Sequence, residues 1–278
     1  MPLRSSEWVN LVAFSCLIVL AWVRRHLDLA RRVRITGIGA VGAVITLFGA
    51  LVLTRWAAPS AVRVTRDWLP LLMVLLFYRQ AGEFVTRAGG GLESRLERLD
   101  VRLVVPLLEW CARLPARAWI FGYLEAAYFS YYAVMPAGVA VLYAAGAASQ
   151  VDRFWTVVLL ASHGSCSTLP FFQTRPPREL GEKWCVPLPH SKLRSFNLLI
   201  LRQGAIHSNT CPSAHVAIAV ACALVLLQAG PLWAGLVFLW IAISIALGAV
   251  GGRYHYAVDA CLGALMGVAG FLAGMVLL

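Results

Sequence analysis

Long apolar runs separated by short polar stretches are the dominant pattern along this chain. The hydrocarbon core of a bilayer requires about 20 consecutive apolar residues in a helix, and by that measure we expect about eight transmembrane helices. Their expected ranges are 8–23, 35–53, 68–85, 119–147, 154–172, 212–229, 232–250 and 256–278. Because lipid offers no hydrogen bonds to the backbone, consecutive spanning helices predict an all-α fold, a polytopic membrane helical bundle.

Residues 92–117 depart from this pattern. Leucines recur there at helical spacing among arginines and glutamates, after three glycines at 89–91. This arrangement is typical of an amphipathic helix that lies in the membrane interface. We therefore divide the chain into residues 1–66, with two N-terminal transmembrane helices, and residues 67–278, a six-helix core that includes the interfacial helix.

The composition supports a membrane protein and narrows its partners. Hydrophobic residues make up 60% and charged residues 13% of the 278 residues, with a mean hydropathy of +0.75. A soluble domain has roughly 45–50% apolar residues. The net charge of +11 comes mostly from arginines between the apolar runs, which favours a topology signal facing anionic lipid over nucleic-acid binding. We expect the bilayer as a partner, and neither a nucleic acid nor a partner protein.

The seven cysteines are scattered, mostly in apolar runs, without a C-x-x-C pair. They are interpreted as small hydrophobic residues, not as a disulfide framework. No group of residues has metal-ligand spacing. The chemistry inferred below requires neither a metal nor another cofactor.

Two expected helices contain charged residues outside the motifs discussed below. Arg79 and Glu83 are four residues apart in the third helix, which favours an ion pair between them over exposure of this part of the helix to a polar cavity. Glu125 lies in the fourth helix, where a carboxylate is costly unless it is paired. A structural partner and a contact with substrate are both open for Glu125.

Further histidines lie outside the motifs discussed below. His163 lies in the fifth expected helix and is interpreted as a hydrogen-bonded core histidine in preference to a site residue. His190 and His207 lie in the polar stretch 173–211 and are minor candidates for binding a head group.

Polar motifs gather at the ends of the last four expected helices. The first is Q-T-R-P-P-R at 173–178, where two prolines stiffen a segment whose Arg175 and Arg178 suit phosphate oxygens. In the second, a proline opens the helix that carries Ser213 and His215. The free N–H groups of such a first turn form an anion site, which His215 would face.

The third motif is G-R-Y-H-Y-A-V-D at 252–259. His255 and Asp259 are four residues apart and would share one helix face. The carboxylate would fix the imidazole tautomer, leave the other nitrogen free to attack, and stabilise the cation that forms. Arg253 could hold an anion against that nitrogen. Because successive helices alternate in direction, the three motifs meet on one side of the membrane and indicate a phosphate-handling site at its surface.

These motifs together carry a family resemblance. P-S-x-H at 212–215, with H-x-x-x-D at 255–259 and R-P at 175–176, resembles the type 2 phosphatidic acid phosphatase/haloperoxidase superfamily. The tighter form H-Y-x-x-D is similar to its phosphotransferase branch, the inositol phosphorylceramide and sphingomyelin synthases. The resemblance covers roughly 67–278 and implies a phosphatase-type six-helix core.

The resemblance also implies residue roles. His255 would be the nucleophile and Asp259 its orienter, His215 would protonate the leaving group, and Arg175 and Arg253 would bind the phosphate. Arg178 and Ser213 complete the set of phosphate-binding groups that we predict from the motifs.

This chain departs from the common phosphatase pattern at two phosphate-binding positions. Thr168 stands where that pattern has lysine, and Ala249 stands where it has arginine six residues before the nucleophile. We assign the arginine's role to Arg253, as in the transferase branch.

We therefore expect an integral membrane lipid-phosphate phosphatase that acts through a phosphohistidine, with a phospholipid or isoprenyl phosphate as substrate. The alternative is a phospholipid head-group phosphotransferase. A lipid transporter or scaffold is the non-enzyme alternative, but it would place ionisable residues at mid-membrane. We expect location in the plasma membrane of a bacterium. The arginines at 24–34 place the motifs on the cytoplasmic side, whereas the family resemblance implies the opposite side.

Overall fold

A computed structural model describes residues 2–86, 90–180, 188–189, 191–204, 206 and 208–277. The described residues form helices and no strand, apart from an isolated antiparallel bridge between Thr174 and Asn209. The expected all-α class is therefore confirmed.

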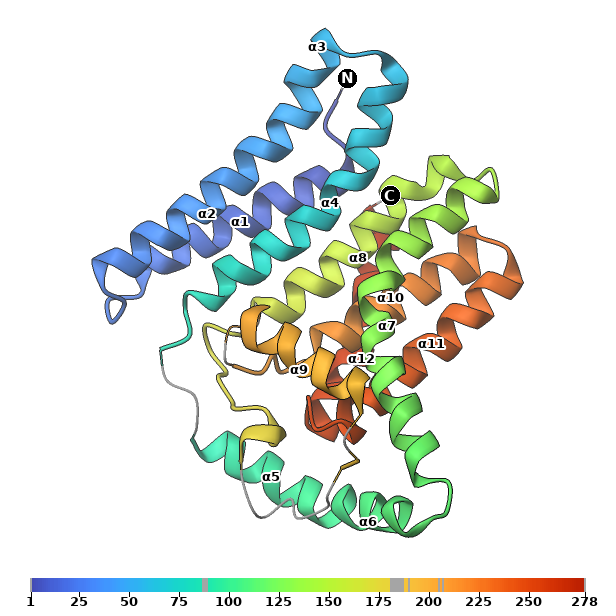
Figure 1. The fold of residues 1–278 in the computed structure, drawn as a ribbon. Coiled ribbons are helices and arrows are strands. Elements are labelled where there is room, and N and C mark those ends of the chain that lie inside the picture. Colours follow the sequence, from blue (N-terminus) through green and yellow to red (C-terminus); the bar gives the residue numbers. More distant parts are fainter. Residues whose placement is uncertain are drawn as a thin grey trace.

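The α-helices run in the following order (Figure 1): α1 (Ser5–Val23), α2 (Leu29–Leu47), α3 (Leu53–Trp56), α4 (Pro59–Gly82), α5 (Gly91–Leu103), α6 (Val105–Arg113), α7 (Arg117–Ala144), α8 (Val151–Cys166), α9 (Lys192–Gly204), α10 (Ala214–Ala229), α11 (Leu232–Gly251) and α12 (Ala257–Leu277). A π-helical segment, Phe48–Val52, joins α2 to α3.

Each of the eight expected apolar ranges contains a helix in this structure, although the helix in the range 154–172 ends at Cys166. Among the described residues, α1, the Leu29–Val52 segment, α7, α11 and α12 are long and apolar enough to cross a membrane. α10 is a shorter apolar helix. α8 is also short, and α4 carries several charged residues, among them Arg66 and Asp67. The bundle is consistent with a membrane protein, while the count of eight spanning helices stays a prediction.

α10 lies at the centre of the bundle and packs against α7, α8, α11 and α12. Glycines bring α12 close to α10, because a Cβ added at Gly263 would lie 2.5 Å from the carbonyl oxygen of Ser213, and one at Gly267 2.7 Å from that of Ala217. Small residues at a helix interface allow such backbone approach. As a result, the start of α12 touches the start of α10, where the Ser213 N–H donates to the Asp259 carbonyl at 2.9 Å.

Ion pairs join the N-terminal segment, including α1, to α4. α1 packs on α8 and α2 on α4. Arg66 binds Glu7 with Nε–Oε1 at 2.7 Å, and Arg4 binds Asp67 with Nη1–Oδ1 at 2.5 Å. The boundary that we expected between residues 66 and 67 falls inside α4, and both residues at the boundary bind the N-terminal segment.

The expected amphipathic helix at 92–117 is two helices, α5 and α6. They meet at Val104, because Pro106 has no N–H to continue the helical hydrogen-bond ladder. Figure 1 shows both lying across one end of the bundle. The polar stretch 173–211 contains the helix α9, which the sequence analysis does not predict.

Candidate active site

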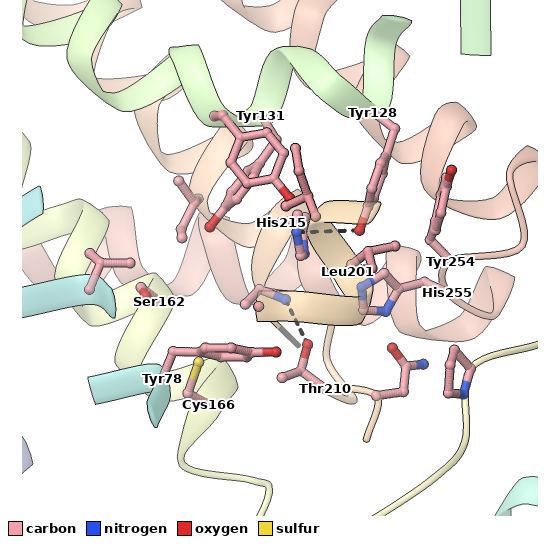
Figure 2. Close-up of a pocket in the computed structure, with 18 of the residues that line it drawn as sticks. Tyr78, Tyr128, Tyr131, Ser162, Cys166, Leu201, Thr210, His215, Tyr254 and His255 are labelled. Carbon is pink, nitrogen blue, oxygen red and sulfur yellow. Dashed lines mark hydrogen bonds between the residues drawn. The ribbon is translucent and has the colours of Figure 1, made fainter. Parts of the chain in front are cut away.

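A cavity of about 320 Å³ lies between α4, α7, α8, α9 and α10, and both motif histidines line it. The imidazole ring centroids of His215 and His255 are 5.5 Å apart. Figure 2 shows the two rings side by side, with Tyr128 and Tyr131 on one side and Tyr78 and Cys166 on another. We call this space the histidine cavity.

His215 is held by aromatic packing in the first turn of α10. Its ring centroid is 4.0 Å from that of Tyr131 and 5.2 Å from that of Tyr128. Nε2 of His215 lies 3.4 Å from the Tyr128 hydroxyl, and Thr210 Oγ1 accepts from the Ala214 N–H at 3.3 Å where the helix begins (Figure 2). The ring therefore has a defined direction toward His255.

His255 and Asp259 are adjacent but not arranged as expected. α12 begins at Ala257, so His255 lies in the preceding turn and does not share a helix face with Asp259. His255 Nδ1 is 3.7 Å from Asp259 Oδ2, which is longer than a hydrogen bond. Asp259 Oδ2 instead accepts hydrogen bonds from the Tyr256 N–H, at 3.2 Å, and from the side-chain amide of Asn209.

Asn209 is a site residue that the sequence analysis misses. It is buried, lines the histidine cavity and donates to Asp259. Its N–H donates to the Thr174 carbonyl at 2.7 Å, which joins the first polar motif to the second. No motif marks Asn209; its place just before the P-S-x-H motif is the one signal in the sequence.

Of the predicted phosphate-binding arginines, Arg178 lines the histidine cavity. Its guanidinium carbon lies 5.9 Å above the ring of Tyr254, and Nη2 is 3.4 Å from Glu179 Oε1. Arg175 points elsewhere: its Nη2 is 2.8 Å from Oε1 of Glu93 on α5. Arg253 and Arg175 are both absent from the described wall of the cavity.

The expected anion site at the start of α10 is partly occupied by the protein itself. The Ser213 N–H donates to the Asp259 carbonyl, and the Ala214 N–H donates to Thr210. Those two N–H groups are therefore not available to a phosphate in this structure. The Ser213 hydroxyl is buried and has no hydrogen-bond partner among the described residues.

Glu125 has structural partners. Its Oε1 accepts from Arg194 of α9 at 2.5 Å, and its Oε2 accepts from Asn197 of α9 at 2.8 Å and from the Tyr254 hydroxyl at 2.6 Å. One carboxylate thus ties α7 to α9 and to the turn that carries His255.

A second pocket of about 300 Å³ adjoins the histidine cavity and shares Arg178 and Leu201 with it. We call it the basic pocket. Its lining residues are Arg178, Glu179, Arg194, Leu198, Leu201 and Arg202.

The charged residues expected to pair in the third helix have other neighbours. The expected Arg79–Glu83 pair is wrong, because Glu83 Oε2 binds Arg34 Nε at 2.8 Å and Arg79 lines the histidine cavity.

His163 is a core histidine, with Nε2 2.9 Å from Asn10 Oδ1 and its ring stacked on an aromatic neighbour. His190 and His207 lie outside the described residues. Within the described ranges, no three His, Cys, Asp or Glu side chains gather as metal ligands.

Comparison with known proteins identifies a family. The PAP2 superfamily model matches residues 94–273, which include both motif histidines and Asp259. No curated protein and no solved structure matches the chain. Members of the superfamily are generally phosphatases or phosphotransferases, and with the apolar helices this match identifies an integral membrane protein of that general type. The synthase branch is not confirmed.

Proposed function

We propose that this chain, which belongs to the PAP2 superfamily, is an integral membrane lipid-phosphate phosphatase that acts through a phosphohistidine on His255. The observation that carries the proposal is the pair of imidazoles, 5.5 Å apart, in the wall of one cavity beside Arg178. One imidazole then attacks phosphorus while the other exchanges a proton with the leaving oxygen. The proposal includes the plasma membrane of a bacterium as the place of action.

The first half-reaction transfers the phosphoryl group to the protein. Asp259 lies on the Nδ1 side of His255, which leaves Nε2 to attack phosphorus. The bond from phosphorus to the lipid oxygen breaks, and His215 protonates that oxygen so that it leaves as an alcohol. Arg178 stabilises the negative charge on the transferring oxygens.

The second half-reaction returns the protein to its starting state. His215, now neutral, takes a proton from a water molecule, and the water oxygen attacks the phosphorus bound to His255. The phosphorus–nitrogen bond breaks, inorganic phosphate leaves, and His215 carries the proton needed for the next cycle.

The wall of the histidine cavity supports a lipid as the substrate. Beyond the histidines it is mostly apolar, and aliphatic side chains come from three separate helices. They include Val74 and Leu75 of α4, Ile200 and Leu201 of α9, and Ile218 of α10. Such a wall suits the acyl or isoprenyl chain of a lipid phosphate, with the phosphate at the polar end.

Transfer to an alcohol is the second candidate, and the basic pocket favours it. The pocket shares Arg178 and Leu201 with the histidine cavity and has room for a second substrate next to the reacting phosphorus. The H-Y-x-x-D spacing at 255–259 also supports transfer. An alcohol would then replace water in the second half-reaction.

A product screen tests the proposal. Purified protein in mixed micelles is given phosphatidic acid or an isoprenyl phosphate labelled in the phosphate, with and without inositol or diacylglycerol. We expect labelled inorganic phosphate, and no product with the His255→Ala variant. Labelled product that appears with an alcohol at the expense of phosphate would establish the transferase. Phosphate release that survives His255→Ala would refute the proposed nucleophile.

A further inference from the structure

The interfacial helix α5 has two chemically different faces. Glu93, Leu96 and Asp100 recur at helical spacing and are buried. The arginines of the same helix are exposed: Arg95, Arg98 and Arg102. α5 therefore directs two of its carboxylates toward the protein and these positive charges outward.

Asp100 binds the start of α12. Both of its carboxylate oxygens lie 3.2 Å from the N–H nitrogen of Ala257, the first residue of that helix. The first N–H groups of a helix lack partners within the helix, so a side-chain oxygen that accepts from one of them is stabilising. Asp100 therefore contacts the backbone of the short segment that carries His255 and Asp259.

Glu93 binds the first polar motif. Its Oε2 accepts from the Arg175 N–H at 2.7 Å, and its Oε1 accepts from Arg175 Nη2 at 2.8 Å. Burial alone would raise the pKa of Glu93, but the hydrogen bonds and charge of Arg175 outweigh it and lower the pKa. The Arg175 carbonyl in turn accepts from the Tyr256 hydroxyl at 3.0 Å. Glu93 therefore fixes the segment that leads to Arg178.

We propose that Asp100 and Glu93 are positioning residues of the reaction site, through which α5 holds the His255 turn and the Arg178 segment in register. Neither carboxylate lines the histidine cavity, so each acts through another residue. A misplacement of about 1 Å at a reacting group can cost on the order of 10²-fold in rate. The inference rests on the proposed function, because it concerns the same site.

Kinetics of Asp100 variants in the full-length protein test the proposal. Asp100→Ala removes the acceptor from Ala257 and should lower kcat by about 10- to 100-fold, while KM changes less than about threefold. Asp100→Asn keeps an amide oxygen that accepts from the same N–H, so it should recover most of the rate. Glu109→Gln is the matched control, because Glu109 is exposed on the neighbouring helix α6 and pairs with Arg113.

Hydrogen exchange tests the positioning without relying on activity. Amide exchange in a peptide covering residues 255–260 should be faster in Asp100→Ala than in the unsubstituted protein, and unchanged in Asp100→Asn and Glu109→Gln. Unchanged exchange together with unchanged kcat in Asp100→Ala would overturn the proposal. If no lipid phosphate is hydrolysed by the unsubstituted protein, the proposed function fails, and the exchange result alone decides whether Asp100 positions the turn.

Discussion

One group of polar side chains lies toward the first end of α4 and α8, and another lies at their second end. The two groups differ in how many of their side-chain atoms have a hydrogen-bond or ion-pair partner. At the first end, Glu7, Arg66 and Asp67 all form hydrogen bonds or ion pairs at close distances. At the second end, the Nδ1 atoms of His215 and His255 are buried without a hydrogen-bond partner among the described residues.

The difference separates a structural cluster from a reactive one. A buried group without a partner costs free energy, so such groups are rare in a folded protein and call for an explanation. Ionisable side chains that converge in a cavity without complete pairing mark a candidate functional site. The first end, which we call the N-terminal ionic cluster, attaches α1 to the core, whereas both imidazoles of the second end line the histidine cavity.

The largest expected effect separates the two histidines of the reactive end. His255→Ala removes the attacking nitrogen, so turnover should be lost on a lipid phosphate and equally on nitrophenyl phosphate. His215→Ala should lose about 10²–10⁴-fold on the lipid, whose alkoxide needs a proton. The same variant should recover much of its rate on nitrophenyl phosphate and should accumulate phosphoenzyme. Equal losses for both variants on both substrates would show that the assigned roles are wrong.

The next effect tests the fully paired end. Glu7→Gln leaves Arg66 buried without its charged partner, and breaking a buried ion pair in this way costs about 3–5 kcal/mol of unfolding free energy. Turnover per folded molecule should not change, because the cluster lies far from the histidine cavity along α4. Thermal unfolding in detergent and the specific activity of the folded fraction measure the two quantities.

Glu109→Gln is again the control, since its exposed pair with Arg113 contributes at most about 1 kcal/mol. Reduced turnover in Glu7→Gln at unchanged stability would place the ionic cluster in the reaction and remove the contrast between the two ends.

A smaller effect is expected at Asn209, whose side-chain amide donates a hydrogen bond to Asp259 at the reactive end. Asn209→Ala removes the side-chain donor to Asp259. A hydrogen bond to a charged group contributes about 1.5–3 kcal/mol, so kcat should fall by about 10- to 100-fold. In a double-mutant cycle with Asp259→Asn the two losses should not add, because Asn209 acts through Asp259. Additive losses would show that Asn209 acts on the substrate directly.

Much of the bundle could be predicted from the sequence, because each long apolar run is a local feature that can be recognised without knowing what the helix packs against. The two histidines could also be paired, since P-S-x-H and H-x-x-x-D place each at the start of a helix and alternation of helices brings those starts together. α9 could not be predicted, because Lys192, Arg194 and Arg202 interrupt its apolar positions and leave a short amphipathic helix that resembles a loop.

The contacts that sequence spacing predicts least well are those between distant segments. Helical spacing places Arg79 and Glu83 on one face, but it cannot show that α2 brings Arg34 to Glu83. For the same reason, nothing local to Arg175 indicates that Glu93 on α5 binds its guanidinium. Asn209 belongs to this class too, since it lies in the segment before α10 and its partner Asp259 lies on α12.

The smallest effect concerns Asp100, the carboxylate at the reactive end that has an elevated pKa. The pKa of Asp100 is raised to about 7, chiefly by burial, with the hydrogen bond from Ala257 opposing the rise and the nearby charge of Asp259 adding to it. The folded protein therefore binds this proton more tightly than the unfolded chain, whose carboxyl has a pKa near 3.8. By linkage, the contribution of this group to the unfolding free energy is fully present below about pH 4 and is lost as the pH rises through about 7. The melting temperature of the unsubstituted protein minus that of Asp100→Asn should fall across this range. A difference that rises with pH would mean that Asp100 is stabilised as an anion, and that the reactive end is better paired than its geometry indicates.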